Sequence, residues 1–229
     1  SEYLIGVAQD LQDYFLKSMD TPLLLSKGEE SGDCCIRLTT KDLSPELAEG
    51  LTKPRGYRLI VEPERITVCG FDERGVGQGC YYIEDLMNLR EGPFLQEQDT
   101  LREPIFSPRM IHSGWGLDAY PDDYLNAMAH HGFDAALLFV GTHQYQSDVI
   151  DRTPKGYQDF NYLIDRAAKY GIDVYAYSYI HSPKHPADPD AEAYYDSTYG
   201  ALFRACPGFK GVTLVGESVE FPSKDPHTT

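Results

Sequence analysis

Gly211-Val212-Thr213-Leu214-Val215 is a short apolar run, and it leads directly into Gly216-Glu217-Ser218. Three earlier runs share its character, at residues 110–112, 134–140 and 172–179. Segments with apolar residues at helical spacing separate these runs, and Gly132 and Gly171 supply stop signals between helix and strand. This alternation of strand, helix and glycine predicts right-handed βα units that share one parallel sheet.

Four βα units make half of a (β/α)8 barrel, whose eight units take about 250 residues. Residues 108–229 number only 122, so four strands are expected and they cannot close on themselves. We therefore expect the first half of a barrel. Either it belongs to a longer polypeptide, or a second copy of the chain covers the open edge as a homo-oligomer.

The N-terminal region predicts a separate, smaller α/β domain. Apolar residues three or four positions apart predict a helix over residues 2–19. Strands are expected at residues 35–39, 57–61 and 66–70, and the short turn between the last two predicts a hairpin. A second helix is indicated by the spacing of Tyr82, Leu86 and Leu89, and an edge strand is expected near Ile105-Phe106. The predicted fold class is α/β, with an accessory domain over residues 1–104 and a partial barrel over residues 105–229.

Three glycines, Gly75, Gly77 and Gly79, resemble a phosphate-binding loop at first sight. Neither GxGxxG nor GxxxxGK spacing is present, and no lysine follows. Close packing of the start of a helix against the sheet explains them better.

Charge and composition exclude several classes of partner. The formal charge is −16 and the isoelectric point is near 4.7, and such a field repels nucleic acids and anionic membranes. No apolar run reaches the roughly 18 residues of a membrane span. The odd count of five cysteines, two of them adjacent, favours reduced thiols and a cytoplasmic location, with secretion left open. The absence of a CxxC spacing and the prolines around His181 and His185 argue against a metal site, and no cofactor is expected.

The carboxyl ends of parallel strands share one edge, so the residues that follow each run are candidates for a site. They are polar and aromatic, a composition that suits a sugar, since aromatic faces stack on sugar rings while polar groups bind hydroxyls. The candidate binding residues are His112, Trp115, Asp118, His143, Tyr179, His181 and Glu220.

Each candidate also has a purely structural interpretation. Trp115 would then cap the end of the barrel, and His112 and His181 would be buried with hydrogen bonds to the backbone. His130 and His131, at a helix end, are expected to interact with the helix dipole. Glu217 follows a buried strand and a glycine, which favours a catalytic role.

The motifs of the N-terminal region resemble the domain that precedes the barrel in β-hexosaminidases and α-glucuronidases. The resemblance rests on residues 56–61 (GYRLIV), 66–68 (ITV) and 74–79 (RGVGQG), and on residues 107–112 (SPRMIH), which are similar to the entry into the first barrel strand. It implies a glycoside hydrolase in which Glu217 is the general acid. In hexosaminidases an Asp precedes this Glu and orients the acetamido group of the substrate, whereas this chain has Gly216.

Two functions remain open at this point. The first is the N-terminal portion of a glycoside hydrolase with a carbohydrate substrate, whose second catalytic carboxylate is expected beyond Thr229. The second is a carbohydrate-binding or assembly module that has the same fold and catalyses nothing. The sequence determines neither the sugar nor the linkage.

Overall fold

The computed structural model describes residues 1–28, 34–112, 120–140, 157–179 and 184–215. The chain divides into two compact units. The first unit comprises residues 1–107 together with 129–132 and 169–171, and the second comprises residues 108–128, 133–168 and 172–229. Each unit contains its own four-stranded sheet.

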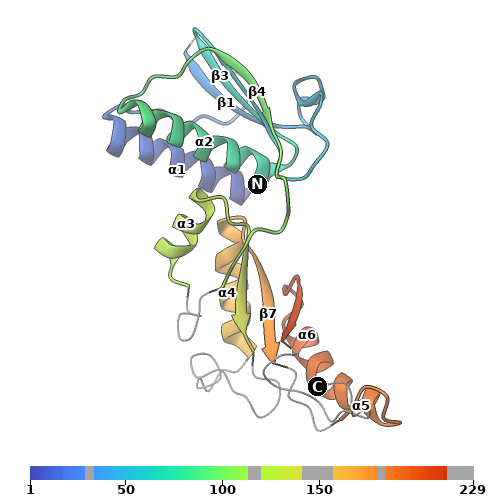
Figure 1. Cartoon of the computed structure of the whole chain (residues 1–229). Helices are drawn as coiled ribbons and strands as arrows, with labels where there is room; N and C mark the ends of the chain where they lie inside the picture. The colour runs from blue at the N-terminus through green and yellow to red at the C-terminus, as the bar shows by residue number, and fades with distance from the viewer. Residues whose placement is uncertain (29–33, 113–119, 141–156, 180–183, 216–229) are drawn as a thin grey trace. The chain divides into compact units, whose positions relative to one another are not determined.

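The first unit is a sheet covered by helices (Figure 1). Its elements are α1 (Glu2–Met19), β1 (Cys35–Thr40), η1 (Pro45–Ala48), β2 (Tyr57–Glu62), β3 (Arg65–Gly70), α2 (Glu73–Arg90) and β4 (Gln98–Arg102). The strand order is β1-β3-β2-β4, in which β1 and β3 are parallel and the other pairs antiparallel. The two long helices lie side by side on one face of this sheet, as Figure 1 shows.

Local signals in the sequence fix the ends of both helices. The Ser1 hydroxyl accepts a hydrogen bond from the backbone N–H of Leu4 at the start of α1. The Asp72 carboxylate accepts one from the N–H of Gly75 at the start of α2 (2.8 Å). Asp20 and Glu91 end α1 and α2 in the left-handed conformation. The predicted helix over residues 2–19 and the predicted hairpin are confirmed.

One face of α2 carries the core of the first unit. Val76, Cys80, Ile83 and Met87 are buried at spacings of three or four residues, and they pack with strand residues such as Leu59 and Val68. The helix indicated by the spacing of Tyr82, Leu86 and Leu89 is present, although Leu89 itself is exposed. Leu89 is two residues, or about 200° of helix rotation, beyond the buried Met87, so its side chain lies on the opposite face of α2.

The three glycines at the start of α2 allow the helix to approach its neighbours closely. A methyl group on Gly75 would lie 2.2 Å from the carbonyl oxygen of Gly56, and one on Gly79 would lie 2.4 Å from Val68. The interpretation as a packing device agrees with these distances.

The predicted edge strand near Ile105-Phe106 is wrong. The edge strand is β4, and both Ile105 and Phe106 are exposed beyond its end. Because β4 has the largely polar sequence QDTLR, its strand character comes from antiparallel pairing with β2 and not from an apolar pattern.

The second unit repeats βα units around a parallel sheet. Its elements are β5 (Met110–His112), α3 (Asp122–His130), β6 (Ala135–Phe139), α4 (Tyr157–Lys169), β7 (Asp173–Tyr179), α5 (Ala191–Tyr195), η2 (Asp196–Gly200), α6 (Ala201–Ala205) and β8 (Gly211–Val215). The strand order is β5-β6-β7-β8, and every pair is parallel. The helical segment expected between the third and fourth strands is present, but it is interrupted by the π-helical turn η2.

Burial follows the expected pattern of a covered parallel sheet. Ala135 and Ala136, adjacent in β6, are both fully buried, so both faces of this strand are covered. Gly132 and Gly171 adopt positive φ angles of 78° and 71° before their strands, as stop signals should. The predicted α/β fold class is thus confirmed. None of the helices in the described part of the chain is long and apolar enough to span a membrane.

Candidate functional site

The four parallel strands of the second unit end at one edge of their sheet. Strand register pairs His112 with Leu137, and pairs Tyr179 at the end of β7 with Val215 at the end of β8. In a parallel sheet these carboxyl ends are where loops gather around ligands. Glu217 is two residues beyond Val215 in the sequence.

One face of this sheet carries aromatic side chains close to that edge. Partners in the register share a face, so His112, Leu137 and Tyr175 form a row across the sheet. The ring of His112 contacts the ring of Tyr177 edge-on, with centroids 4.9 Å apart. The ring of Tyr175 lies over Gly211, where an added methyl group would come within 3.1 Å of it.

Tyr120 is anchored directly before the start of α3. Its side chain is fully buried, and its hydroxyl donates a hydrogen bond to the carbonyl oxygen of Leu137 (2.6 Å). Arg166 of α4 donates to the carbonyl oxygen of Tyr120 (2.9 Å) and to the carboxylate of Asp122 (2.7 Å). These contacts fix the start of α3 to both β6 and α4.

The structure describes two of the predicted site residues. His112 is described in full at the end of β5, and Tyr179 is described as the last residue of β7 by its backbone alone. The others lie outside the described residues, and their roles stay predictions: Trp115, Asp118, His143, His181, Glu217 and Glu220.

His185 takes part in a local turn. Its Nδ1 accepts a hydrogen bond from the N–H of Ala187, and its own N–H donates to the Asp188 carboxylate. Lys184 beside it forms an ion pair with Asp190 (2.6 Å).

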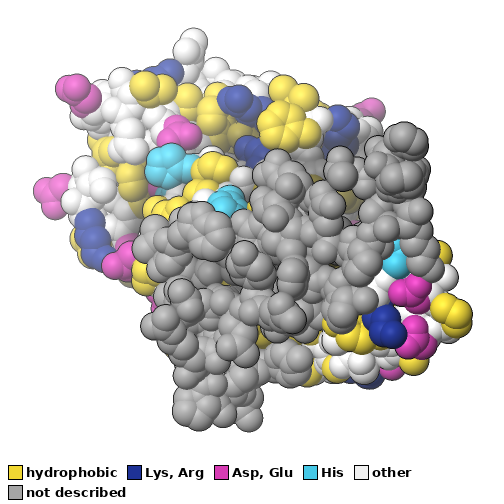
Figure 2. Space-filling model, turned by 60° about the horizontal axis from the view of Figure 1, so that its bottom comes forward, with side chains coloured by type: hydrophobic (Ala, Val, Ile, Leu, Met, Phe, Trp, Pro, Cys, Tyr) yellow, Lys and Arg dark blue, Asp and Glu magenta, His cyan; other side chains and the backbone are white. Residues whose placement is uncertain are grey.

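In Figure 2, acidic and basic side chains are interspersed on the described surface in view, despite the acidic net charge.

A second cluster of titratable groups lies in the first unit. The Nε2 of His130 is 3.1 Å from the Oδ2 of Asp10 and 3.1 Å from the Oε2 of Glu84. The side chain of Glu84 is only 7% exposed, and burial raises its pKa. The ring of Tyr81 packs against the ring of His130, with centroids 4.2 Å apart.

Sequence reasoning missed this cluster. Its members come from α1, α2 and the last residue of α3, and no local motif joins them. His130 was expected to interact with the helix dipole, but its partners are two carboxylates from other helices. The one available signal was a glutamate on the apolar face of α2, next to Ile83 and one turn after Cys80.

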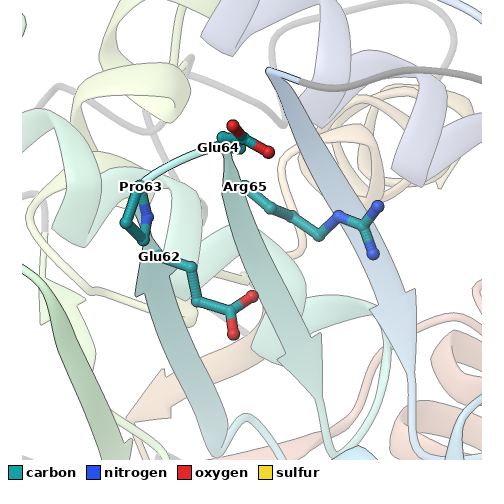
Figure 3. A pocket seen from close by; sticks show the side chains of 4 residues that line it. All are labelled: Glu62, Pro63, Glu64 and Arg65. Atoms are coloured by element: carbon teal, nitrogen blue, oxygen red, sulfur yellow. The ribbon is translucent and has the colours of Figure 1, made fainter.

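A depression also lies at the turn between β2 and β3 (Figure 3). It is lined by Glu62, Pro63, Glu64 and Arg65, and the side chain of Arg65 extends toward β1 in this view. These residues belong to an exposed hairpin turn that offers two carboxylates and no buried polar group. The carboxyl ends of β5–β8 in the second unit are therefore the better candidate for a binding site.

No protein-family model and no curated protein matches the sequence. Solved structures do match. The chain superimposes on CpGH84B with a TM-score of 0.64 and 13% identity, covering 95% of this chain and 39% of that one. A GH138 enzyme targeting pectin rhamnogalacturonan II gives a TM-score of 0.62 and 13% identity, covering 96% of this chain and 30% of that one.

A GH20 β-N-acetylhexosaminidase from Streptomyces coelicolor A3(2) gives a TM-score of 0.58 and 19% identity, covering 81% of this chain and 41% of that one. The chain has a glycoside hydrolase-like fold. At these identities the likeness is one of fold alone, and the chain spans less than half the length of each of these proteins.

Proposed function

We propose that this chain is the N-terminal portion of a glycoside hydrolase that binds carbohydrate at the carboxyl ends of β5–β8, with Glu217 as general acid. The observation that carries the proposal is the parallel order β5-β6-β7-β8, which brings four strand ends to one edge, with Glu217 two residues after the last. The likeness in fold to three glycoside hydrolases supports it.

The acid role requires a particular environment for Glu217. A general acid must hold its proton near neutral pH, so burial or a neighbouring carboxylate must raise its pKa. Cleavage also needs a second carboxylate or a group of the substrate. A second carboxylate would stand about 5.5 Å away for retention of configuration, or up to about 9.5 Å away for inversion. The partner group would come from strands that follow β8.

The sugar would be held by the residues that follow the strands. Trp115 would stack on a sugar ring, and hydroxyl groups would bind His112, Asp118, His143, Tyr179, His181 and Glu220. The edge-on contact with Tyr177 gives the imidazole of His112 a defined orientation for such a hydrogen bond.

The exposed side chains of β8 support further βα units in the complete protein. Val212 pairs with Ala176 and Leu214 with Ser178, so both lie on the sheet face where Ala176 is fully buried. Yet Val212 is 40% and Leu214 51% exposed. In a complete barrel a further helix would cover this face of β8.

The substrate is best sought among the classes named for the similar structures. These are β-N-acetylhexosaminides and pectic rhamnogalacturonan II. Gly216 replaces the Asp that orients an acetamido group in hexosaminidases, so we expect pectic oligosaccharides to be turned over faster than N-acetylhexosaminides.

The test compares Glu217→Gln with Glu192→Gln, an exposed glutamate of α5, in the full-length gene product. Loss of a general acid typically costs about 10²- to 10⁴-fold in rate. We expect kcat to fall by that factor in Glu217→Gln only, with sugar binding by calorimetry unchanged. The isolated 229-residue chain should show no turnover.

Each other outcome has a definite meaning. Equal hydrolysis by Glu217→Gln and the parent would remove Glu217 from the mechanism. Sugar binding by the parent without any hydrolysis would identify a non-catalytic binding module. The absence of both sugar binding and hydrolysis in the parent would overturn the proposal.

A further inference from the structure

Two carboxylates of the first unit converge on one imidazole nitrogen. Asp10 Oδ2 and Glu84 Oε2 are each 3.1 Å from Nε2 of His130. A ring nitrogen carries at most one hydrogen, which points along one direction and cannot serve two acceptors well. A hydrogen bond from this nitrogen therefore does not account for the approach of both oxygens.

The spacing of these atoms fits ligands that share one cation. Nitrogen and oxygen ligands lie about 2.0–2.2 Å from Zn²⁺, which places two ligands of the same ion roughly 2.8–3.6 Å apart for octahedral to tetrahedral angles. Both 3.1 Å separations fall inside this range. The three ligand atoms all lie within 4.8 Å of one another.

The carboxylate of Glu84 supplies a second, independent observation. Its Oε1 is buried and has no hydrogen-bond partner among the residues that the structure describes. A buried carboxylate oxygen without a partner is energetically unfavourable, and a bound cation removes this cost.

We propose that Asp10, Glu84 and His130 bind a first-row divalent cation, with Zn²⁺ as the representative ion. One imidazole and two carboxylates are a ligand set that Zn²⁺ accepts, with a fourth position left for water. The ion joins α1, α2 and the segment 129–132 within the first unit, and it stabilises that unit as a structural metal does.

Neighbouring groups hold the proposed ligands in place. The ring of Tyr81 packs on the His130 imidazole at an interplanar angle of 38°. The hydroxyl of Tyr14 donates to the backbone carbonyl oxygen of Glu84 (3.1 Å). Such surrounding contacts reduce the reorganisation that metal binding requires.

The experiment must separate this site from the thiols. Cys34 is exposed and next to Cys35, and thiolates bind Zn²⁺ well. The parent protein should therefore be the tag-free, chelator-treated 229-residue chain with Cys34→Ser and Cys35→Ser. Calorimetric titration with Zn²⁺ should give one ion per chain, and Zn²⁺ should raise the thermal midpoint.

The decisive comparison is His130→Gln against His131→Gln, the exposed histidine next to it. Removing a ligand should weaken Zn²⁺ binding at least tenfold and abolish the rise in thermal midpoint, while His131→Gln should behave as the parent does. If His130→Gln does not fold, Asp10→Asn takes its place. The Co²⁺-loaded protein should lack the thiolate charge-transfer absorption that cysteine ligands would produce.

Two results would overturn the proposal. One is equal Zn²⁺ affinity in the parent and in His130→Gln. The other is a thermal midpoint of the parent that Zn²⁺ does not change. In either case the three residues form an ion-pair cluster only. Because the site lies in the first unit, its failure would not affect the proposed glycosidase site at the edge of the second sheet.

Discussion

At the scale of single residues, the fold requires glycine at position 75 because a side chain there would clash with the backbone. Gly75 lies in the first turn of α2, where an added methyl group would stand 2.2 Å from the carbonyl oxygen of Gly56. The obstructing atom belongs to the backbone, so no flexible side chain can move aside. The start of α2 approaches the sheet only because this position has no Cβ.

We therefore expect Gly75→Ala to destabilise the protein, by at least the 1–3 kcal/mol or so typical of overpacked cores. Gly6→Ala is the matched control, because Gly6 is also helical and a methyl group there meets nothing within 4 Å. The control should gain about 0.5–1 kcal/mol from helix propensity. Urea unfolding, monitored by circular dichroism, measures the free energy of unfolding of both variants. A loss of equal size in the two variants would contradict the packing argument.

At the scale of elements, β4 is held to the sheet partly by charge. Arg58 of β2 donates two hydrogen bonds of 2.7 Å to the carboxylate of Asp99 on β4. This interaction lowers the pKa of Asp99. Since both side chains remain partly exposed, the pair contributes less than about 1 kcal/mol.

The pH dependence of this contribution has a definite sign. Because the Asp99 pKa is lower in the folded state, the stabilisation is present above the unfolded pKa of about 3.9 and is lost as the pH falls through the folded pKa. In a carboxyl-carbon NMR titration, Arg58→Gln should raise the Asp99 pKa toward about 3.9. The exposed Lys27→Gln should leave it unchanged. An Asp99 pKa that Arg58→Gln does not alter would show that the pair has no influence in solution.

The sequence predicted strands correctly where both faces of the strand are buried, and it missed a strand whose side chains are mostly polar. The apolar run around Ala135 and Ala136 predicted β6, because a strand covered on both faces must be apolar throughout. The polar strand β4 escaped prediction because its pairing with β2, and not its own side chains, makes it a strand. The spacing of Tyr82, Leu86 and Leu89 predicted a helix, which α2 confirms, but spacing alone does not say which face of the helix meets the sheet, and Leu89 is exposed.

The candidate sites differ in how far the sequence could predict them. Local patterns locate the strands of the second sheet, and the ends of those strands place His112 and Tyr179 at its carboxyl edge. The cluster around His130 depends on contacts between residues far apart in the chain. No spacing rule encodes such contacts, because three separate helices must first fold together to create them.

At the scale of the whole molecule, β8 is the last strand of the second sheet in the part of the chain that the structure describes, and its apolar face is incompletely covered. The strand order places β8 last in the sheet, and Val212 and Leu214 remain exposed on it. An edge strand with exposed apolar side chains is a template for pairing with another chain. The exposed β8 therefore allows the isolated 229-residue chain to self-associate. Covering β8 would prevent this association.

We expect concentration-dependent self-association of the isolated chain in sedimentation velocity, as the predicted homo-oligomer requires. Leu214→Lys should shift the population toward monomer, because a charge on an edge strand opposes pairing with a second copy. Leu24→Lys is the control, since Leu24 is almost fully exposed and belongs to the first unit. A monomer at every concentration, or an equal shift in both variants, would show that β8 is not the contact. In the full-length gene product, where further βα units are proposed to cover β8, the same measurement should give no association through this strand.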